Sequence, residues 1–241
     1  MLCHEYKCIF VHIPKTAGQS IEHVFLRRLG LTWETRAPLL LRPNNNPKLG
    51  PPALAHLTAS EYITCGHVTP EQFDSYFKFS FVRNPWARIV SEYKYRGYPK
   101  KIDFKTYLFK HLPKPGWSDE YRHIMPQYNF LYDEKGKLLV DFVGKFENLQ
   151  NDFYKVCKRL GFPPITLPHA NKSLKSDKHI SLIRRIKKII SVKNILSNFK
   201  VRKNTFQHDP GFMVRNQKNL VKNYIKKILK HLDINLTANT L

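Results

Sequence analysis

Residues 10–20 read FVHIPKTAGQS, and this segment constrains the fold more than any other part of the chain. An apolar run ends at Pro14, a short turn with one glycine follows, and a helical pattern begins near Ser20. This order predicts a strand, a tight turn and the start of a helix. Amides at a helix N-terminus, together with a lysine and hydroxyl groups, suit a phosphate or a sulfate. We therefore expect an anion site at this turn.

The turn differs from the common nucleotide-binding loop. In that loop the lysine follows the last glycine, whereas here Lys15 precedes Gly18, which is the only glycine of the segment. Taken alone, the segment also fits a strand, a turn and a helix with an incidental lysine. A second anion-binding motif is needed to decide between the two interpretations.

Residues 79–96, FSFVRNPWARIVSEYKYR, supply such a motif. A β-rich run over residues 77–82 ends at Arg83, and Pro85 then stands where the first turn of a helix accepts proline. Ser91 falls two turns beyond Pro85, near the face from which Arg83 emerges. A forked guanidinium and a hydroxyl together suit a phosphate monoester. For this motif alone, a salt-bridged arginine and a surface serine are the alternative.

Together the two motifs resemble the two cofactor signatures of the sulfotransferases that use 3'-phosphoadenosine-5'-phosphosulfate (PAPS). They are most similar to the branch that acts on carbohydrates, which includes the heparan, chondroitin and dermatan sulfotransferases. The resemblance implies that the first loop holds the 5'-phosphosulfate and that Arg83 and Ser91 hold the 3'-phosphate. The loop residues carried over by position are Lys15, Thr16, Ala17, Gly18, Gln19 and Ser20. Gln19 stands where the family more often has threonine or serine.

The likeness runs in order through further segments as far as residue 173. These segments read ITCGHV (63–68), MPQ (125–127), VDFVGKFENL (140–149) and LPHANKS (167–173). The resemblance adds Lys172 and Ser173 to the expected cofactor site. We therefore expect a PAPS-binding core over residues 1–173 and a basic, helical C-terminal extension over residues 174–241, packed on that core.

Transfer of a sulfuryl group requires a base for the acceptor hydroxyl and a positive group for the leaving oxygen. His67 follows a predicted strand, and an imidazole titrates near neutrality. Its Gly-His-Val sequence also resembles the segment that bears the catalytic histidine in uronyl sulfotransferases, so that His67 is the expected base. Lys15 is the expected stabiliser of the departing phosphate. His12 and His169 are weaker candidates for the base, and the mechanism implies no metal.

The pattern of elements predicts an α/β fold with a mostly parallel central sheet flanked by helices, similar to the nucleotide-binding-loop-like fold of sulfotransferases. Ligands of such sheets gather at the carboxyl ends of the strands. Strands are expected near residues 7–13, 61–66, 77–83 and 139–146. Helices are expected near residues 19–29, 70–76, 86–96, 103–111, 148–160, 180–197 and 216–232. The proline-rich residues 36–58 are expected to form a long loop and are a candidate substrate lid.

The chain of 241 residues carries a net charge of +23, and residues 171–241 hold much of the excess, with 17 Lys and Arg against three Asp and Glu. Two amphipathic stripes in this region predict helices with lysines outside. Such helices could pack on the core, attach to an anionic membrane surface, or bind nucleic acid or a protein. An acidic carbohydrate or glycoconjugate acceptor also suits a positive protein. Nucleic acid is not expected as a partner, because no recognised binding motif is found.

The sequence contains no apolar stretch long enough to span a membrane and no secretory pattern at its start. We therefore expect a cytoplasmic protein, with peripheral attachment to a membrane as the alternative. The four cysteines show no close metal-ligand spacing and are expected to be reduced thiols.

Two competing functions stay open at this point. A nucleotide-dependent kinase or hydrolase would use Asp141, which ends the apolar run 138–141 and resembles a magnesium-binding strand end. A basic nucleic-acid-binding protein built on a degenerate enzyme would account for the lysine-rich tail. The misplaced lysine of the first loop and the Arg83 and Ser91 motif count against the kinase or hydrolase. The aromatic residues, which fall mostly in core-like patterns, and the lack of a recognised binding motif count against the nucleic-acid-binding protein.

Overall fold

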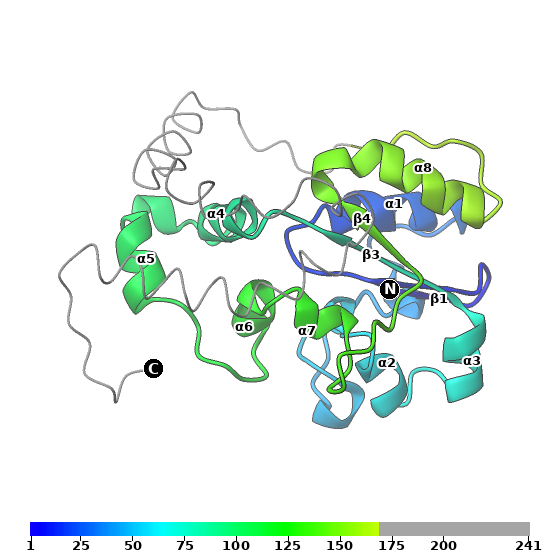
Figure 1. Cartoon of the computed structure of the whole chain (residues 1–241), viewed down its shortest axis with the longest axis horizontal. Coiled ribbons are helices and arrows are strands. Elements are labelled where there is room, and N and C mark those ends of the chain that lie inside the picture. Colours follow the sequence, from blue (N-terminus) through cyan, green and yellow to red (C-terminus); the bar gives the residue numbers. More distant parts are fainter. Residues whose placement is uncertain (169–241) are drawn as a thin grey trace, which may run out of the picture. The chain divides into compact units, whose positions relative to one another are not determined.

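The computed structural model describes residues 1–168 of the chain (Figure 1). Lys172 and Ser173, the weaker base candidate His169 and the two C-terminal helices expected from the sequence lie outside these residues, and so does the proposed extension 174–241. No helix within the described part is long and apolar enough to cross a membrane.

A four-stranded sheet forms the centre of residues 1–168, with the strands in the order β1-β2-β3-β4. The strands are β1 (Leu2–Cys3), β2 (Cys8–Val11), β3 (Phe77–Val82) and β4 (Phe142–Lys145). β1 pairs with β2 in the antiparallel sense, whereas β2 with β3 and β3 with β4 are parallel. The predicted α/β fold with a mostly parallel sheet is thus confirmed.

Eight α-helices and five short 3₁₀ segments surround the sheet in the described residues. The helices are α1 (Gly18–Arg28), α2 (Glu61–Thr64), α3 (Pro70–Ser75), α4 (Pro85–Tyr95), α5 (Phe104–Lys110), α6 (Asp119–Ile124), α7 (Tyr128–Leu131) and α8 (Leu149–Arg159). The 3₁₀ segments are Ala37–Leu39, Pro47–Leu49, Leu54–His56, Tyr98–Lys100 and Phe146–Asn148.

Each face of the sheet has its own apolar core. Because side chains alternate along a strand, Ile9 and Val11 of β2 join one cluster while Phe10 joins the other. The Phe10 cluster contains the apolar faces of α1 and α8, which lie on the same side of the sheet in Figure 1. The Ile9 cluster contains side chains of α2, α3 and α7. Helices thus cover both faces, as the near-continuous apolar strands require.

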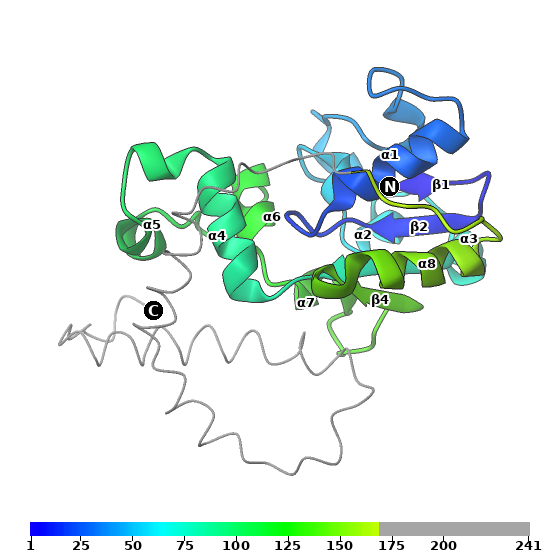
Figure 2. The same cartoon turned by 90° about the horizontal axis from the view of Figure 1, so that it is seen from above.

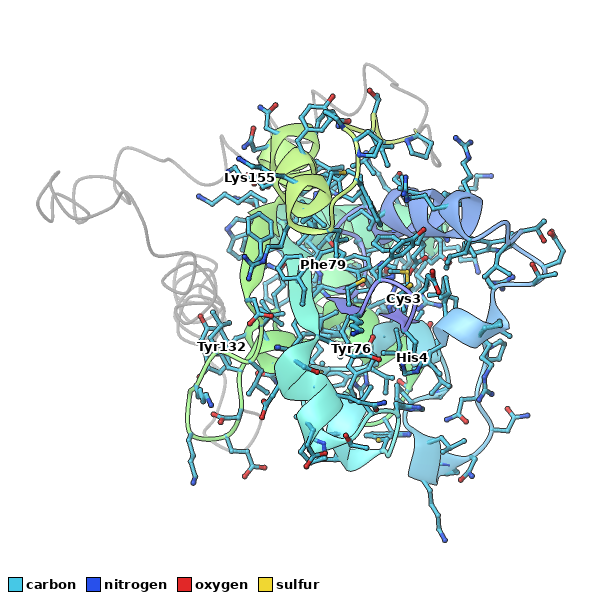
Figure 3. All side chains as sticks on the ribbon, turned by 90° about the vertical axis from the view of Figure 1, so that its right-hand side faces the viewer. Cys3, His4, Tyr76, Phe79, Tyr132 and Lys155 are labelled. Carbon is cyan, nitrogen blue, oxygen red and sulfur yellow. The ribbon has the colours of Figure 1, made fainter. Side chains whose placement is uncertain are left out.

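The two ends of the sheet differ in what they carry. At the amino end of the parallel strands, His4 Nδ1 lies 2.8 Å from the Tyr76 hydroxyl, and the two side chains are neighbours in Figure 3. At the carboxyl end, the loop after β2 extends toward α4 and α6 (Figure 2). The expected anion motifs both lie at this carboxyl end.

The prediction of a strand over residues 61–66 is wrong, because residues 61–64 form helix α2. Thr58 and Glu61 bond each other reciprocally: the Glu61 amide donates to Thr58 Oγ1 over 3.3 Å, and the Thr58 amide donates to Glu61 Oε2 over 2.8 Å. The pair has the Thr-x-x-Glu spacing and the two reciprocal bonds of a capping box, and it lies in the turn that leads into α2, whose N-cap is Ser60. The signal was present in the sequence and outweighs the β-branched residues that follow it.

The proline-rich loop over residues 36–58 exists, but it is packed against the domain. It contains three of the 3₁₀ segments, and Leu39, Leu54 and Leu57 are buried in the two cores. The side-chain amide of Asn44 donates through Nδ2 to the carbonyl oxygens of Asn46 and Gly50, each over 2.8 Å. A segment held in this way does not resemble a free lid.

Candidate anion-binding site

The backbone of the loop between β2 and α1 takes an unusual conformation. Lys15 and Ala17 have φ angles of 70° and 72°, although neither is glycine. Left-handed residues of this kind cost free energy and gather at ligand-binding turns. Ala17 is also the N-cap of α1 and makes no side-chain capping bond. The first amides of a helix have no partner within the helix, so that an anion could take the place of the missing cap.

Gly18 is required because the ring of His12 lies directly against it. A Cβ atom on Gly18 would lie 2.0 Å from His12 Nε2, far inside contact distance. The His12 ring is held in turn by Glu22 of α1, whose Oε1 is 2.6 Å from His12 Nδ1. The first turn of α1 therefore folds over a buried histidine that supports the loop from below.

The second motif begins where β3 ends. Asn84 caps α4 by accepting bonds from the amides of Trp86 and Ala87, and Pro85 occupies the first turn as predicted. Gln127, which is fully buried, accepts a bond from the Arg83 amide and donates to the Arg83 carbonyl, each over 2.8 Å. Its observed role is to fix the backbone of Arg83.

Two arginines join the loop to α4. Arg83 donates through a guanidinium NH group to the Lys15 carbonyl over 3.1 Å. Arg88 donates through Nε to the Pro14 carbonyl over 2.9 Å. Arginines of the second motif thus bind two neighbouring backbone carbonyls of the first motif. The two motifs lie about 70 residues apart in the sequence, and they meet because neighbouring parallel strands end at the same edge of the sheet.

Arg88 is a functional residue that the sequence reasoning missed. Besides Pro14, its guanidinium donates to the carbonyls of Met125 and His123 over 2.9 and 2.8 Å, and it is buried. Burial lowers its pKa to about 10, so that the guanidinium stays charged at neutral pH. The Asn-Pro-x-x-Arg sequence of residues 84–88 could have drawn attention to Arg88. Only the fold shows that the partners of its guanidinium are backbone carbonyl oxygens.

Arg83, one of the two side chains expected to meet a 3'-phosphate, has an unused hydrogen-bond donor within residues 1–168. Arg83 Nε is buried and has no hydrogen-bond partner within residues 1–168, and Phe146 lies against the Arg83 guanidinium at 3.9 Å. Burial lowers the pKa of Arg83, because the charged form loses hydration there. An anion bound beside the guanidinium would stabilise its charged form and so offset the loss of hydration. Ser91 is partly exposed on α4. It lies about one helical turn before Tyr95, the last residue of α4, and eight residues after Arg83.

Lys15 places its ammonium group beside the loop. Its Nζ atom lies 3.7 Å from the ring centre of Tyr95, near the end of α4. Burial lowers the pKa of Lys15, and the carboxylate of Glu92 partly offsets this effect. The ammonium group is thus held at the junction of the two motifs.

The other loop residues divide into buried and partly exposed ones. Thr16 is fully buried and donates its hydroxyl to the Ile13 carbonyl over 2.7 Å. Its side chain therefore belongs to the loop's internal structure, and only its backbone is suited to a ligand. Ala17, Gln19 and Ser20 are partly exposed at the start of α1.

His67 does not lie where the sequence placed it. It follows helix α2 and the left-handed Gly66, not a strand end. Its Nε2 atom lies 2.7 Å from the Leu49 carbonyl, within the packed proline-rich loop. The strand-end argument for His67 as a base is therefore wrong, and the resemblance is its remaining support.

Three other histidines gather beside the anion loop. The rings of His12 and His56 are 4.8 Å apart, and those of His56 and His123 are 5.1 Å apart. The ring of His123 is stacked on the ring of Tyr95, which the ammonium group of Lys15 also contacts. The cluster thus reaches the loop from two sides, through His12 under Gly18 and through Tyr95 under Lys15.

Part of this cluster has the ligand types of a metal site. Donor atoms of His56, Asp119 and His123 lie within 4.8 Å of one another. Asp119, however, is already paired with Arg96 over 3.1 Å. A dication would also meet the positive field of nearby arginines, and we assign no metal to these residues.

Asp141 does not occupy a magnesium-binding position. It lies directly before β4, at the amino end of the strand, and accepts a bond from the Lys78 amide over 2.7 Å. Lys78 Nζ lies 3.1 Å from the same carboxylate. Because the anion motifs are at the carboxyl ends of the parallel strands, Asp141 is at the opposite end of the sheet. The expectation that links Asp141 to a kinase or hydrolase is therefore wrong.

Substitution of Gly18 by alanine should disturb the loop, since the added methyl group cannot fit beside His12. Overpacking of this kind costs about 1 to 3 kcal/mol of unfolding free energy. Gly116→Ala is the matched control, because its Cβ would make only an ordinary contact at 3.9 Å. Urea denaturation of both variants measures the difference. Equal stability of the two variants would show that His12 does not press on the loop.

Comparison with known proteins agrees with this geometry. A family model described as sulfotransferase family matches residues 1–209, which include both anion motifs and extend beyond Ser173. An uncharacterized protein from Archaeoglobus fulgidus is 40% identical over 92 residues, which make up 38% of this chain and 72% of that protein. No solved structure matches the chain. The chain belongs to the sulfotransferase family.

Proposed function

We propose that this protein transfers a sulfuryl group from PAPS to a hydroxyl group of a carbohydrate or glycoconjugate. The observation that carries the proposal is the junction of the two motifs, where Arg83 donates to the Lys15 carbonyl. This junction joins a helix N-terminus and a lysine to an arginine whose Nε atom has no hydrogen-bond partner in the described part of the chain. A nucleotide with phosphate groups at both the 5' and 3' positions needs two anion sites of this kind.

The residues present fit such a nucleotide. The uncapped start of α1 offers backbone amides to a 5'-phosphosulfate, and the lysine beside it adds a charge. Arg83 offers its guanidinium to a 3'-phosphate, and Ser91 of α4 offers a hydroxyl. Lys172 and Ser173 remain proposed contacts that lie outside the described residues.

When bound, PAPS supplies a sulfuryl group, whose transfer replaces the bond from sulfur to the 5'-phosphate oxygen by a bond to the acceptor oxygen. Lys15 stabilises negative charge at the phosphate, since its ammonium group lies beside the loop that holds it. The amides at the start of α1 act in the same direction through the helix dipole. Arg88 and Gln127 act indirectly, because they fix the backbones of Pro14 and Arg83.

A histidine takes the proton of the acceptor in this proposal. His67 is the candidate implied by the resemblance to uronyl sulfotransferases. His56 is the candidate that lies against His12 beside the loop. An imidazole is the side chain that most often acts as a general base.

A carbohydrate acceptor is supported by the resemblance to the carbohydrate branch and by the high positive charge of +23. The cytoplasmic location and the attachment of the lysine-rich C-terminal sequence to the core or to an anionic membrane stay predictions.

Transfer of radioactive sulfate from labelled PAPS tests the proposed reaction. The purified chain is incubated with a panel of desulfated polysaccharides, lipid-linked sugars and small alcohols. We expect label in at least one carbohydrate and none with ATP as the donor of a labelled phosphate. Phosphate transfer without sulfate transfer would contradict the proposal.

Arg83→Ala should weaken binding of 3'-phosphoadenosine 5'-phosphate more than binding of adenosine 5'-phosphosulfate, since only the former has a 3'-phosphate. A lost charge-assisted bond is worth about 1.5 to 3 kcal/mol, or on the order of tenfold to a hundredfold in affinity. Ser91→Ala should act in the same direction with a smaller effect. Calorimetry on each variant measures both ligands.

Arg159→Ala is the control for Arg83→Ala, because Arg159 is exposed and lies near Phe77, at the amino end of β3. Its affinity for both nucleotides should be unchanged. Equal losses for the two nucleotides in Arg83→Ala would remove Arg83 from the 3'-phosphate site.

A further inference from the structure

The three clustered histidines differ in their partners, and this difference distinguishes their chemistry. His12 has a carboxylate partner in Glu22, at 2.6 Å from Nδ1, and His123 has one in Glu92, at 2.7 Å from Nδ1. Both glutamates are buried. An ionised carboxylate only accepts hydrogen bonds, so that each of these Nδ1 atoms carries a proton.

Both glutamates are held in the ionised form. Burial raises the pKa of Glu22, but the charge and hydrogen bond of His12 outweigh this effect, so that the pKa lies below its usual range. Burial likewise raises the pKa of Glu92, and His123 and Arg96 outweigh it. Each of the two outer histidines is thus paired with an ionised carboxylate.

His56, between them, forms no ion pair with a carboxylate of residues 1–168. Its Nδ1 atom lies 3.3 Å from the His12 carbonyl oxygen, which can only accept a bond. Nδ1 therefore carries the proton, and Nε2 keeps its lone pair. No hydrogen bond to Nε2 is found among the residues that the structure describes, and the side chain is partly exposed.

The position of His56 suits a reaction at the anion loop. Its ring lies 4.8 Å from that of His12, which presses on Gly18 at the start of α1. On the other side, its ring is 5.1 Å from that of His123, which is stacked on the Tyr95 ring that Lys15 covers. His56 is therefore linked to the start of α1 through the ring of His12, and to the Lys15 ammonium group through the rings of His123 and Tyr95.

We propose that His56, and not His67, is the general base of the reaction. This inference rests on the proposed function. His56 Nε2 accepts the proton that the acceptor hydroxyl loses as its oxygen forms a bond to sulfur. The electron pair of the broken bond stays on the phosphate oxygen beside Lys15, and Nε2 later gives its proton to water.

The surroundings of His56 keep its ring neutral. Burial lowers the pKa of His56 well below its usual range, and charge interactions with His12 and His123 act in the same direction. The charged or titratable groups of the elements packed around it are His12, Glu22, Glu92, Asp119, Arg122, His123 and the amino group of Met1. The lone pair of His56 is therefore available at neutral pH and is lost only when the pH falls through the lowered pKa.

His67 lacks this relation to the loop. Its Nε2 atom is engaged with the Leu49 carbonyl, in a segment packed beside Trp117, whose indole donates to the neighbouring Gly50 carbonyl. None of the contacts of His67 within residues 1–168 involves a residue of the anion site.

The test compares three asparagine variants, His56→Asn, His67→Asn and His111→Asn, in the full chain. Asparagine can keep the bond from position 56 to the His12 carbonyl but cannot take up a proton near neutral pH. His111 is exposed at the end of α5 and serves as the control. Sulfate transfer from PAPS is measured from pH 5 to pH 8, with the acceptor found in the polysaccharide panel.

We expect His56→Asn to lower turnover by about a hundredfold to ten-thousandfold. Calorimetric affinity for 3'-phosphoadenosine 5'-phosphate should remain within a few fold of wild type, which also shows that the variant folds. The wild-type rate should fall only below about pH 6.5, the ordinary pKa of histidine, and this acidic limb should vanish in His56→Asn. His111→Asn should match the wild type throughout.

A second measurement does not depend on turnover. In the free protein, the histidine ring resonance that is missing from the NMR spectrum of His56→Asn should titrate below about pH 6.5. If His56→Asn retains wild-type turnover and the acidic limb while His67→Asn loses both, His56 is not the base. If the wild-type protein transfers no sulfate while the His56 resonance titrates as expected, the proposed function has failed and not the assignment of a neutral ring.

Discussion

Two hydrogen bonds from guanidinium groups to carbonyl oxygens hold the site of this protein together. Arg83 donates to the Lys15 carbonyl and Arg88 to the Pro14 carbonyl, so that the start of α4 fixes the loop before α1. Bonds from a charged donor are worth more than neutral ones, and a buried arginine without partners would be costly. The loop's left-handed residues, Lys15 and Ala17, persist because these bonds and the neighbouring packing determine their conformation.

The sequence predicted the elements whose cause is local. Apolar strands, the proline in the first turn of α4 and the glycine of the first loop are local signals, and they placed Lys15 and Arg83 at strand ends correctly. Helix α2 was misread because a capping box competed with a short apolar run. The roles of Arg88 and Gln127 were missed because their partners are backbone groups of distant segments, and no sequence periodicity reports such contacts.

The histidine cluster also depends on contacts between distant segments, which the sequence does not report. His12, His56 and His123 come from the end of a strand, a 3₁₀ turn in the proline-rich loop and a short helix. Each one reads in the sequence as an ordinary histidine, and the pairing with Glu22 and Glu92 depends on α1 and α4 packing across the end of the sheet. Reasoning from motifs therefore favoured His67, whereas three-dimensional contacts favour His56.

A crystal structure with 3'-phosphoadenosine 5'-phosphate tests most directly the claim that the two motifs form one site. The account predicts that the 5'-phosphate lies on the amides at the start of α1, beside Lys15, and that the 3'-phosphate lies within hydrogen-bonding distance of the Arg83 guanidinium and the Ser91 hydroxyl. A nucleotide bound elsewhere, or one whose 3'-phosphate meets neither Arg83 nor Ser91, would contradict the account.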